Sequence, residues 1–293
     1  MKTFKGAGVA LVTPFQTDGS IDFSALQQLV AFQIKGGTDF LVVQGTTGES
    51  PTLSQEEKRK VLETVLEVNS GQVPVVYGIG GNYTAGLETL FKNLPSGVEG
   101  ILSVSPYYNK PIQKGIVAHF KQVASYTDLP IILYNVPGRT GSNMSVETTL
   151  ELAEISNVVA VKEASGNMEQ IMDIIRQRKP GFGVLSGDDN LTMPLIAAGA
   201  DGVISVVANA FPERFAQMVH ASIKGDLALA KEAHYDLFNV TKMFFEEGNP
   251  GGVKVALAAR GLMQETMRMP LYPVSEVLRS RIQAETTRLL SVL

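Results

Sequence analysis

The feature that most restricts the fold is an alternation of short apolar segments with longer amphipathic ones, which occurs eight times. The apolar segments are GVALVTP, FLVVQG, VPVVYGIG, GILSVSP, PIILYNVP, VVAVKEA, GVLSGDD and GVISVVAN. Segments that are apolar throughout indicate strands covered on both faces, as in parallel sheets with helical crossovers. Eight such units within about 225 residues predict an α/β fold, a (β/α)8 (TIM) barrel.

The segments between the apolar runs have helical spacing and recognisable starts. Ser54 and Glu57 form a capping-box pattern, in which each side chain satisfies a free backbone N–H of the other residue, and a second helix start is expected at Ser145. A doubly wound open sheet is the alternative, but it would require a Gly-x-Gly-x-x-Gly turn after an early strand, and the sequence has none there.

The pattern changes to helices alone from about Asp226 onwards, with a GNPGG interruption. We therefore predict two domains: a barrel over residues 1–225 with its active site at the carboxyl ends of the strands, and a small helical domain over residues 226–293.

Composition excludes several classes of protein. The 293 residues carry a formal net charge of -4, which argues against nucleic acid or an anionic membrane as the main partner. No cysteine is present, which excludes thiolate chemistry and fits a reducing compartment. The first apolar segment, GVALVTP, is short and ends in Thr-Pro. It therefore indicates a first strand rather than a signal peptide. No segment approaches the roughly 18 apolar residues of a membrane-spanning helix. We expect a cytoplasmic protein without a membrane partner.

Polar residues follow most of the predicted strands. They are Thr13, Thr46, Thr47, Asn82, Tyr107, Tyr108, Tyr134, Asn135, Lys162, Ser186 and Asp188. Strands have to exit into water, so any one of these residues has an ordinary explanation. In this fold, however, the strand ends build the active site, and several hydroxyls converging on one lysine favour catalysis.

Lys162 ends the strand segment VVAVK, where a cation is unexpected. One interpretation is an ion pair with Glu163, although adjacent strand residues point to opposite faces. The other is a nucleophile, because burial favours the neutral form of an amine, which attacks a ketone to give a Schiff base. Tyr134 ends the preceding strand and is the expected neighbour for proton transfer.

Two loops could hold a charged substrate. The segment 45–49, Gly-Thr-Thr-Gly-Glu, is rich in glycine and precedes a helix, a place where backbone N–H groups bind anions. It lacks the Gly-Lys-Ser/Thr ending of a nucleotide loop, which favours a carboxylate. Arg139 could bind a second carboxylate through two hydrogen bonds, although a loop arginine is more often solvated.

Other chemistries have little support. His119, His220 and His234 lie in helical segments rather than at strand ends, and no metal-binding histidine motif is present. Asp188 and Asp189 indicate a loop start or helix cap more than a metal site. A Gly-x-Ser-x-Gly elbow is absent. We expect no metal.

Six motifs together resemble a known family. GTTGES, SPYYNKP, YNVPGRTG, VKEASG, LSGDD and GVISV are similar, in order and spacing, to the dihydrodipicolinate synthase branch of the pyruvate aldolases, a family that also contains N-acetylneuraminate lyases. The resemblance covers essentially the whole chain, including the NPGGVK break.

The resemblance implies a role for each candidate residue. Lys162 would form a covalent imine with pyruvate and no cofactor would be needed. Thr47, Tyr134 and Tyr108 would relay protons, with Tyr108 supplied by a neighbouring subunit of a dimer or of a tetramer built as a dimer of dimers. Thr46 and Thr47 would hold the pyruvate carboxylate, and Gly187 and Ile204 would line the lysine pocket.

The implied second substrate is L-aspartate 4-semialdehyde, bound by Arg139, and the product is 4-hydroxy-tetrahydrodipicolinate on the path to lysine and diaminopimelate. Thr46-Thr47 with Arg139 favours this branch over a sugar-acid aldolase, since sialic acid lyases carry Ser-Thr and lack the Gly-Arg-Thr-Gly loop. A non-catalytic barrel is the remaining alternative.

Feedback-inhibited members of this family bind lysine at a subunit interface. The matching positions here are Ser50, Gln55, Lys58, Asn82, Gly86 and Tyr107. Lys58 would repel the ammonium of lysine, and Gly86 removes the expected anion. We therefore predict weak or absent inhibition by lysine.

Overall fold

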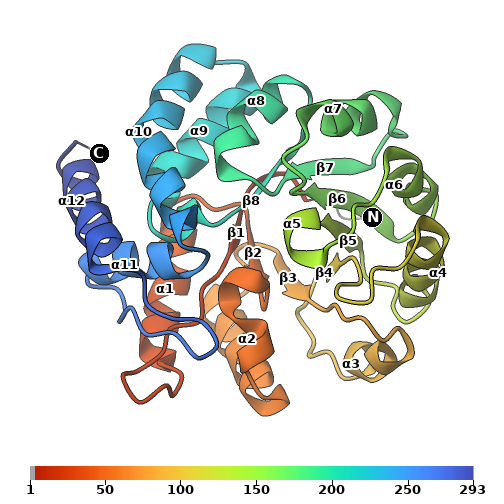
Figure 1. Ribbon diagram of the computed structural model, residues 1–293, viewed down its shortest axis with the longest axis horizontal. Coiled ribbons are helices and arrows are strands. Elements are labelled where there is room, and N and C mark those ends of the chain that lie inside the picture. Colours follow the sequence, from red (N-terminus) through yellow and green to blue (C-terminus); the bar gives the residue numbers. More distant parts are fainter. Residues whose placement is uncertain (1–3, 293) are drawn as a thin grey trace.

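The computed structural model describes residues 4–292 and shows a closed barrel of eight parallel strands (Figure 1). The strands are β1 (Gly6–Ala10), β2 (Phe40–Val43), β3 (Val75–Gly78), β4 (Gly100–Val104), β5 (Ile131–Asn135), β6 (Val158–Glu163), β7 (Gly183–Ser186) and β8 (Gly202–Ser205). Each strand pairs with the next along the chain, and β8 pairs with β1. The predicted (β/α)8 barrel is confirmed.

A pair of glycines closes the barrel between its first and last strands. Gly6 and Gly202 are register partners, and a Cβ atom on Gly202 would lie 2.2 Å from the carbonyl oxygen of Gly6. No side chain fits in that space, so β1 and β8 approach each other at this point only because residue 202 is glycine.

The apolar residues form two layers, as expected for strands that are buried on both faces. Alternate residues, such as Val42, Val76 and Ile132, fill the barrel interior. The others, such as Leu41, Val75 and Ile131, pack against the surrounding helices. Because side chains alternate across a strand, this arrangement explains why the segments read as apolar throughout.

Residues 4–292 also form twelve α-helices. They are α1 (Phe23–Lys35), α2 (Gln55–Asn69), α3 (Glu88–Lys92), α4 (Gln113–Ala124), α5 (Pro137–Thr140), α6 (Val146–Ala153), α7 (Met168–Gln177), α8 (Thr192–Ala197), α9 (Pro212–Lys224), α10 (Leu227–Glu246), α11 (Gly251–Ala259) and α12 (Glu276–Val292). Over these described residues no helix has the length and apolarity needed to cross a bilayer.

Both predicted helix starts are confirmed. Ser54 Oγ accepts from the Glu57 N–H at 3.2 Å, and the Glu57 carboxylate accepts from the Ser54 N–H at 2.8 Å. Ser145 Oγ accepts from the Thr148 N–H at 3.2 Å at the start of α6. These caps satisfy backbone donors that the helix itself leaves free.

The last three helices follow the barrel, as the sequence predicted. Asp226 caps α10, which packs against α9, and α12 packs against α10 and α11 at the edge of the molecule (Figure 1). The division into domains 1–225 and 226–293 stays a prediction. Residues of α10 and of the α10–α11 junction also line a cavity at the carboxyl ends of the barrel strands.

Candidate active site

Lys162 and Tyr134 lie side by side at the carboxyl ends of β6 and β5. They are register partners in adjacent strands, and Lys162 Nζ lies 4.5 Å from the centroid of the Tyr134 ring. Both side chains are buried, with Lys162 only 5% exposed. The predicted proximity of the two residues is confirmed, and an amine in this position is shielded from water.

Glu163 is directed away from Lys162 and has partners of its own. Its carboxylate accepts from Asn135 Nδ2 at 3.0 Å and from Gln170 Nε2 at 2.7 Å. Burial raises the pKa of Glu163, which these hydrogen bonds oppose. The ion pair with Glu163 that was an alternative role for Lys162 does not form, because alternation along the strand separates the two side chains.

A cavity of about 900 Å³ opens above these residues. Lys162, Tyr134, Thr46, Thr47, Arg139 and Gly187 line it together with Asp188, Asn190 and Val206. The cavity therefore brings together residues from the carboxyl ends of five strands, β2, β5, β6, β7 and β8, and from the loops that follow them. Arg139 is exposed and lies on the four-residue helix α5, so its side chain can meet a substrate that enters from solvent.

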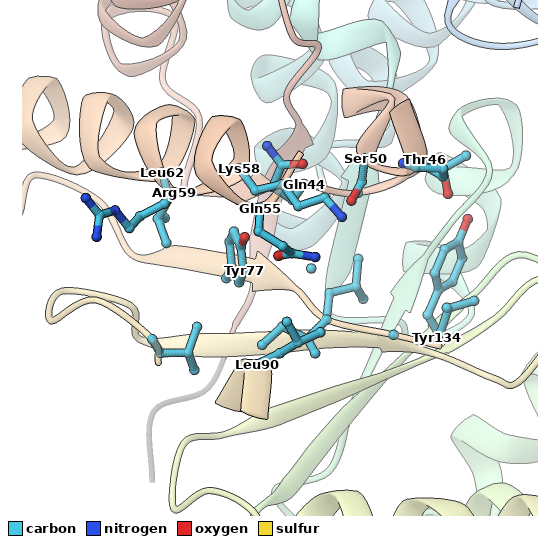
Figure 2. Close-up of a pocket in the computed structure, with 18 of the residues that line it drawn as sticks. Gln44, Thr46, Ser50, Gln55, Lys58, Arg59, Leu62, Tyr77, Leu90 and Tyr134 are labelled. Carbon is cyan, nitrogen blue, oxygen red and sulfur yellow. The ribbon is translucent and has the colours of Figure 1, made fainter. Parts of the chain in front are cut away.

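The two threonines of the Gly-rich loop have different surroundings. The loop forms a short 3-10 turn, η1 (Thr46–Gly48), whose Gly48 carbonyl accepts from Thr13 Oγ1 at 2.7 Å. Thr47 Oγ1 is buried and accepts from Asn249 Nδ2 at 3.0 Å. Figure 2 shows Thr46 and Tyr134 with their hydroxyl ends directed toward each other.

Gly187 lies close to the lysine, whereas Ile204 does not line the cavity. A Cβ atom on Gly187 would lie 3.1 Å from Lys162 Cε and 2.6 Å from Ala164 Cβ, so the absence of a side chain leaves room beside the lysine. Ile204 is buried in the barrel interior in the same cluster as Tyr134.

Asp188 and Asp189 have structural roles at the end of β7. Asp188 caps the turn η4 (Asp189–Leu191) by accepting from the Asn190 N–H at 3.0 Å. Asp189 is buried, accepts from Ser205 Oγ and from the Val206 N–H, and its pKa is raised to about 6 by that burial. In residues 4–292 we find no group of three or more histidines and carboxylates placed to hold a metal ion.

Tyr108 is the one proposed relay residue that a single chain does not bring to the lysine. Its side chain is 87% exposed, its φ is +71°, and it lines neither of the two cavities described here. Tyr108 therefore lies at the surface of the chain, outside the cavity that Lys162 lines.

A second cavity of about 830 Å³ adjoins the first, and both are lined by Thr46, Tyr134 and Arg139. Ser50, Gln55 and Lys58 also line the second one (Figure 2), as does Tyr107. Burial lowers the pKa of Lys58.

Two other predicted lysine-site positions lie outside this lining. Asn82 Nδ2 donates to the Tyr107 carbonyl at 3.3 Å, and Gly86 lies against the Tyr83 ring.

The C-terminal helices supply residues to the first cavity that were not predicted from the sequence. They are Thr241, Lys242, Phe245, Glu246 and Asn249. The GNPGG interruption marked the end of a helix, and α10 does end at Glu246. Nothing in its spacing indicated that the junction lies against the loop of Thr47, some 200 residues earlier.

Comparison with known proteins identifies relatives over the whole chain. The dihydrodipicolinate synthetase family model matches residues 3–289. The 4-hydroxy-tetrahydrodipicolinate synthase of Parabacteroides distasonis is 49% identical over 98% of this chain and 97% of its own.

Solved structures agree. A dihydrodipicolinate synthase from Thermotoga maritima matches with a TM-score of 0.96 at 39% identity, covering 100% of both chains. A dihydrodipicolinate synthase from Cyanidioschyzon merolae with lysine bound matches with a TM-score of 0.93 at 37% identity, covering 100% of both chains. Relatives of this class are lyases of the class I aldolase type, which use a lysine Schiff base and no cofactor. The chain is an enzyme that belongs to the dihydrodipicolinate synthetase family.

Proposed function

We propose that this enzyme condenses pyruvate with L-aspartate 4-semialdehyde to 4-hydroxy-tetrahydrodipicolinate, in the biosynthesis of lysine and diaminopimelate. The observation that carries the proposal is the buried pair of Lys162 and Tyr134 in a cavity that also presents an anion-binding loop and an arginine. The names of the relatives support the choice of reaction.

The reaction would begin when the amine of Lys162 attacks the ketone carbon of pyruvate and water leaves, which gives an imine. Loss of a methyl proton then converts the imine to an enamine, whose carbon attacks the aldehyde and forms the new C–C bond. The amino group of the second substrate finally attacks the imine carbon, releases the lysine amine and closes the ring. Tyr134 lies where a hydroxyl can carry the protons of these steps.

The relay threonine was predicted to be Thr47, and the geometry supports a different division of roles. We propose that Thr46 passes protons with Tyr134, because the hydroxyl ends of these two residues point toward each other (Figure 2). Thr47 would instead donate to the pyruvate carboxylate, because its oxygen already accepts from Asn249. Tyr108 would complete the relay from a second copy of the chain, since it is exposed and turned outward.

We propose that Arg139 selects the aldehyde by binding the carboxylate of the semialdehyde. The test is to measure pyruvate consumption with L-aspartate 4-semialdehyde and, in parallel, with N-acetylmannosamine. We expect turnover with the semialdehyde alone. An Arg139→Lys variant should raise the KM for the semialdehyde about 10-fold or more, because a point charge replaces two parallel hydrogen bonds. Turnover with the sugar alone would assign the chain to the sugar-acid aldolases.

We propose that free lysine inhibits this enzyme weakly or not at all. Lys58 lines the second cavity with no acidic partner in the described residues, and Gly86 offers no carboxylate. The expected result is less than 50% inhibition at about 1 mM lysine, because like charges repel at short range. The measurement is initial rate against lysine concentration. A steep inhibition curve below 1 mM would contradict the proposal, and a Lys58→His variant shows whether the cation is the cause.

We also propose a homo-oligomer, either a dimer or a tetramer, because the relay needs a second copy of Tyr108. A cytoplasmic location remains a prediction from the cysteine-free composition.

A further inference from the structure

The junction between α10 and α11 reaches into the active site through a single side chain. Asn249 is 8% exposed and lines the same cavity as Lys162. Its Nδ2 donates to Thr47 Oγ1 at 3.0 Å, and this is the only hydrogen bond of the Thr47 hydroxyl within the described chain. The contact joins the C-terminal helices to the loop that faces the substrate.

This hydrogen bond restricts what the Thr47 hydroxyl can do. A threonine hydroxyl has one proton to donate and two lone pairs that accept. The Asn249 N–H occupies one lone pair, and within the described residues no group accepts the Thr47 hydroxyl proton, while Asn249 Oδ1 is itself buried without a partner. Thr47 lines the cavity, so a carboxylate bound there is the acceptor that we infer for this proton.

The α10–α11 junction is followed directly by a second contact with the loop of Thr47, made by Lys254 of α11. Lys254 is fully buried and forms an ion pair with Glu49, two residues after Thr47. Its Nζ also donates to the carbonyls of Thr13 at 2.9 Å and Thr266 at 2.8 Å. The start of α11 therefore cannot shift without disturbing the loop.

We propose that Asn249 is a positioning residue that orients the O–H of Thr47 toward the carboxylate of bound pyruvate. The inference rests on the proposed function and deepens it. It assigns the C-terminal helices a role in substrate binding, with Asn249 acting through Thr47 and not on the reacting atoms.

The test is a double-mutant cycle that combines Asn249→Ala with Thr47→Val. The readout is the pyruvate concentration that gives half-maximal borohydride trapping on the enzyme, measured beside kcat and KM. In the natural background, Asn249→Ala should raise that concentration about 10-fold, as for the loss of one hydrogen bond to a charged group. In the Thr47→Val background the same change should have less than a twofold effect. In a Thr47→Ser background, which keeps the hydroxyl, the full effect should return.

Asn157→Ala is the matched control. Asn157 is a buried asparagine remote from the cavity, whose Nδ2 donates to the Ala124 and Thr127 carbonyls. It should lower stability and leave the half-maximal concentration unchanged. Equal effects of Asn249→Ala in all three backgrounds, no effect in any, or the same shift in Asn157→Ala would overturn the inference. Absence of trapping by the natural enzyme would instead contradict the proposed function.

Discussion

Replacing Lys162 with arginine is expected to abolish reductive trapping of pyruvate and to lower kcat by about 10³-fold or more, as for the loss of a catalytic nucleophile. Arginine keeps a long cationic side chain at the end of β6 but stays protonated in proteins, so it cannot attack a ketone. The Schiff base could not form, and every later step depends on it.

The measurement is borohydride treatment in the presence of pyruvate, followed by mass spectrometry of the peptides. Lys242→Arg is the matched control, because Lys242 lines the same cavity from α10 and has no role in the proposed chemistry. It should trap pyruvate as the natural enzyme does. Trapping that persists at one site in Lys162→Arg would show that another lysine is the nucleophile.

The barrel could be predicted because each of its strands leaves a signal in a short segment of the sequence. Strands that are buried on both faces must be apolar along their length, and eight such runs are visible without any three-dimensional information. Ser54 and Glu57 could be read for the same reason, since a capping box is a contact between residues three positions apart. The strand-end rule then placed Lys162 beside Tyr134.

Contacts between the C-terminal helices and the loops of the barrel could not be predicted. Asn249 and Thr47 are 202 residues apart, and no periodicity relates a helix junction to a loop of the barrel. The direction of a side chain within a turn could not be predicted from the sequence either. Thr46 and Thr47 are neighbours in a 3-10 turn, where one residue changes the direction of a side chain by about a third of a turn. The sequence therefore did not indicate which of the two threonines is directed toward Tyr134.

The C-terminal helices are more closely tied to the site than a separate domain would require. α10 supplies Thr241 and Phe245 to the cavity wall, and the α10–α11 junction supplies Asn249. A substitution in this region should therefore affect both folding and substrate binding. The buried ion pair between Lys254 at the start of α11 and Glu49 in the loop after β2 is an example, because it joins the helices to the barrel.

Replacing Lys254 with methionine is expected to lower the free energy of unfolding by about 3–5 kcal/mol, the usual effect of removing one partner of a buried ion pair. Lys254 and Glu49 are both fully buried, and burial lowers the pKa of Lys254 to about 8 although Glu49 opposes this. Without the ammonium, the Glu49 carboxylate keeps the Arg268 N–H at 3.1 Å but loses its only countercharge at contact distance in the described residues. An unpaired charge in a dry site is far more costly than a missing apolar contact. Chemical denaturation measures the change.

The matched control is Lys60→Met, which removes the exposed pair between Lys60 and Glu56 at 2.7 Å and should cost no more than about 1 kcal/mol. A double variant, Lys254→Met with Glu49→Leu, should recover most of the lost stability, because apolar residues of similar volume replace a buried pair without leaving a charge behind. If the double variant is no more stable than Lys254→Met alone, the loss comes from the hydrogen bonds to Thr13 and Thr266 rather than from the unpaired carboxylate. The second substitution removes the carboxylate and also the acceptor of the Arg268 backbone N–H, so recovery should stop short of the natural stability by the cost of that one hydrogen bond, about 1 kcal/mol.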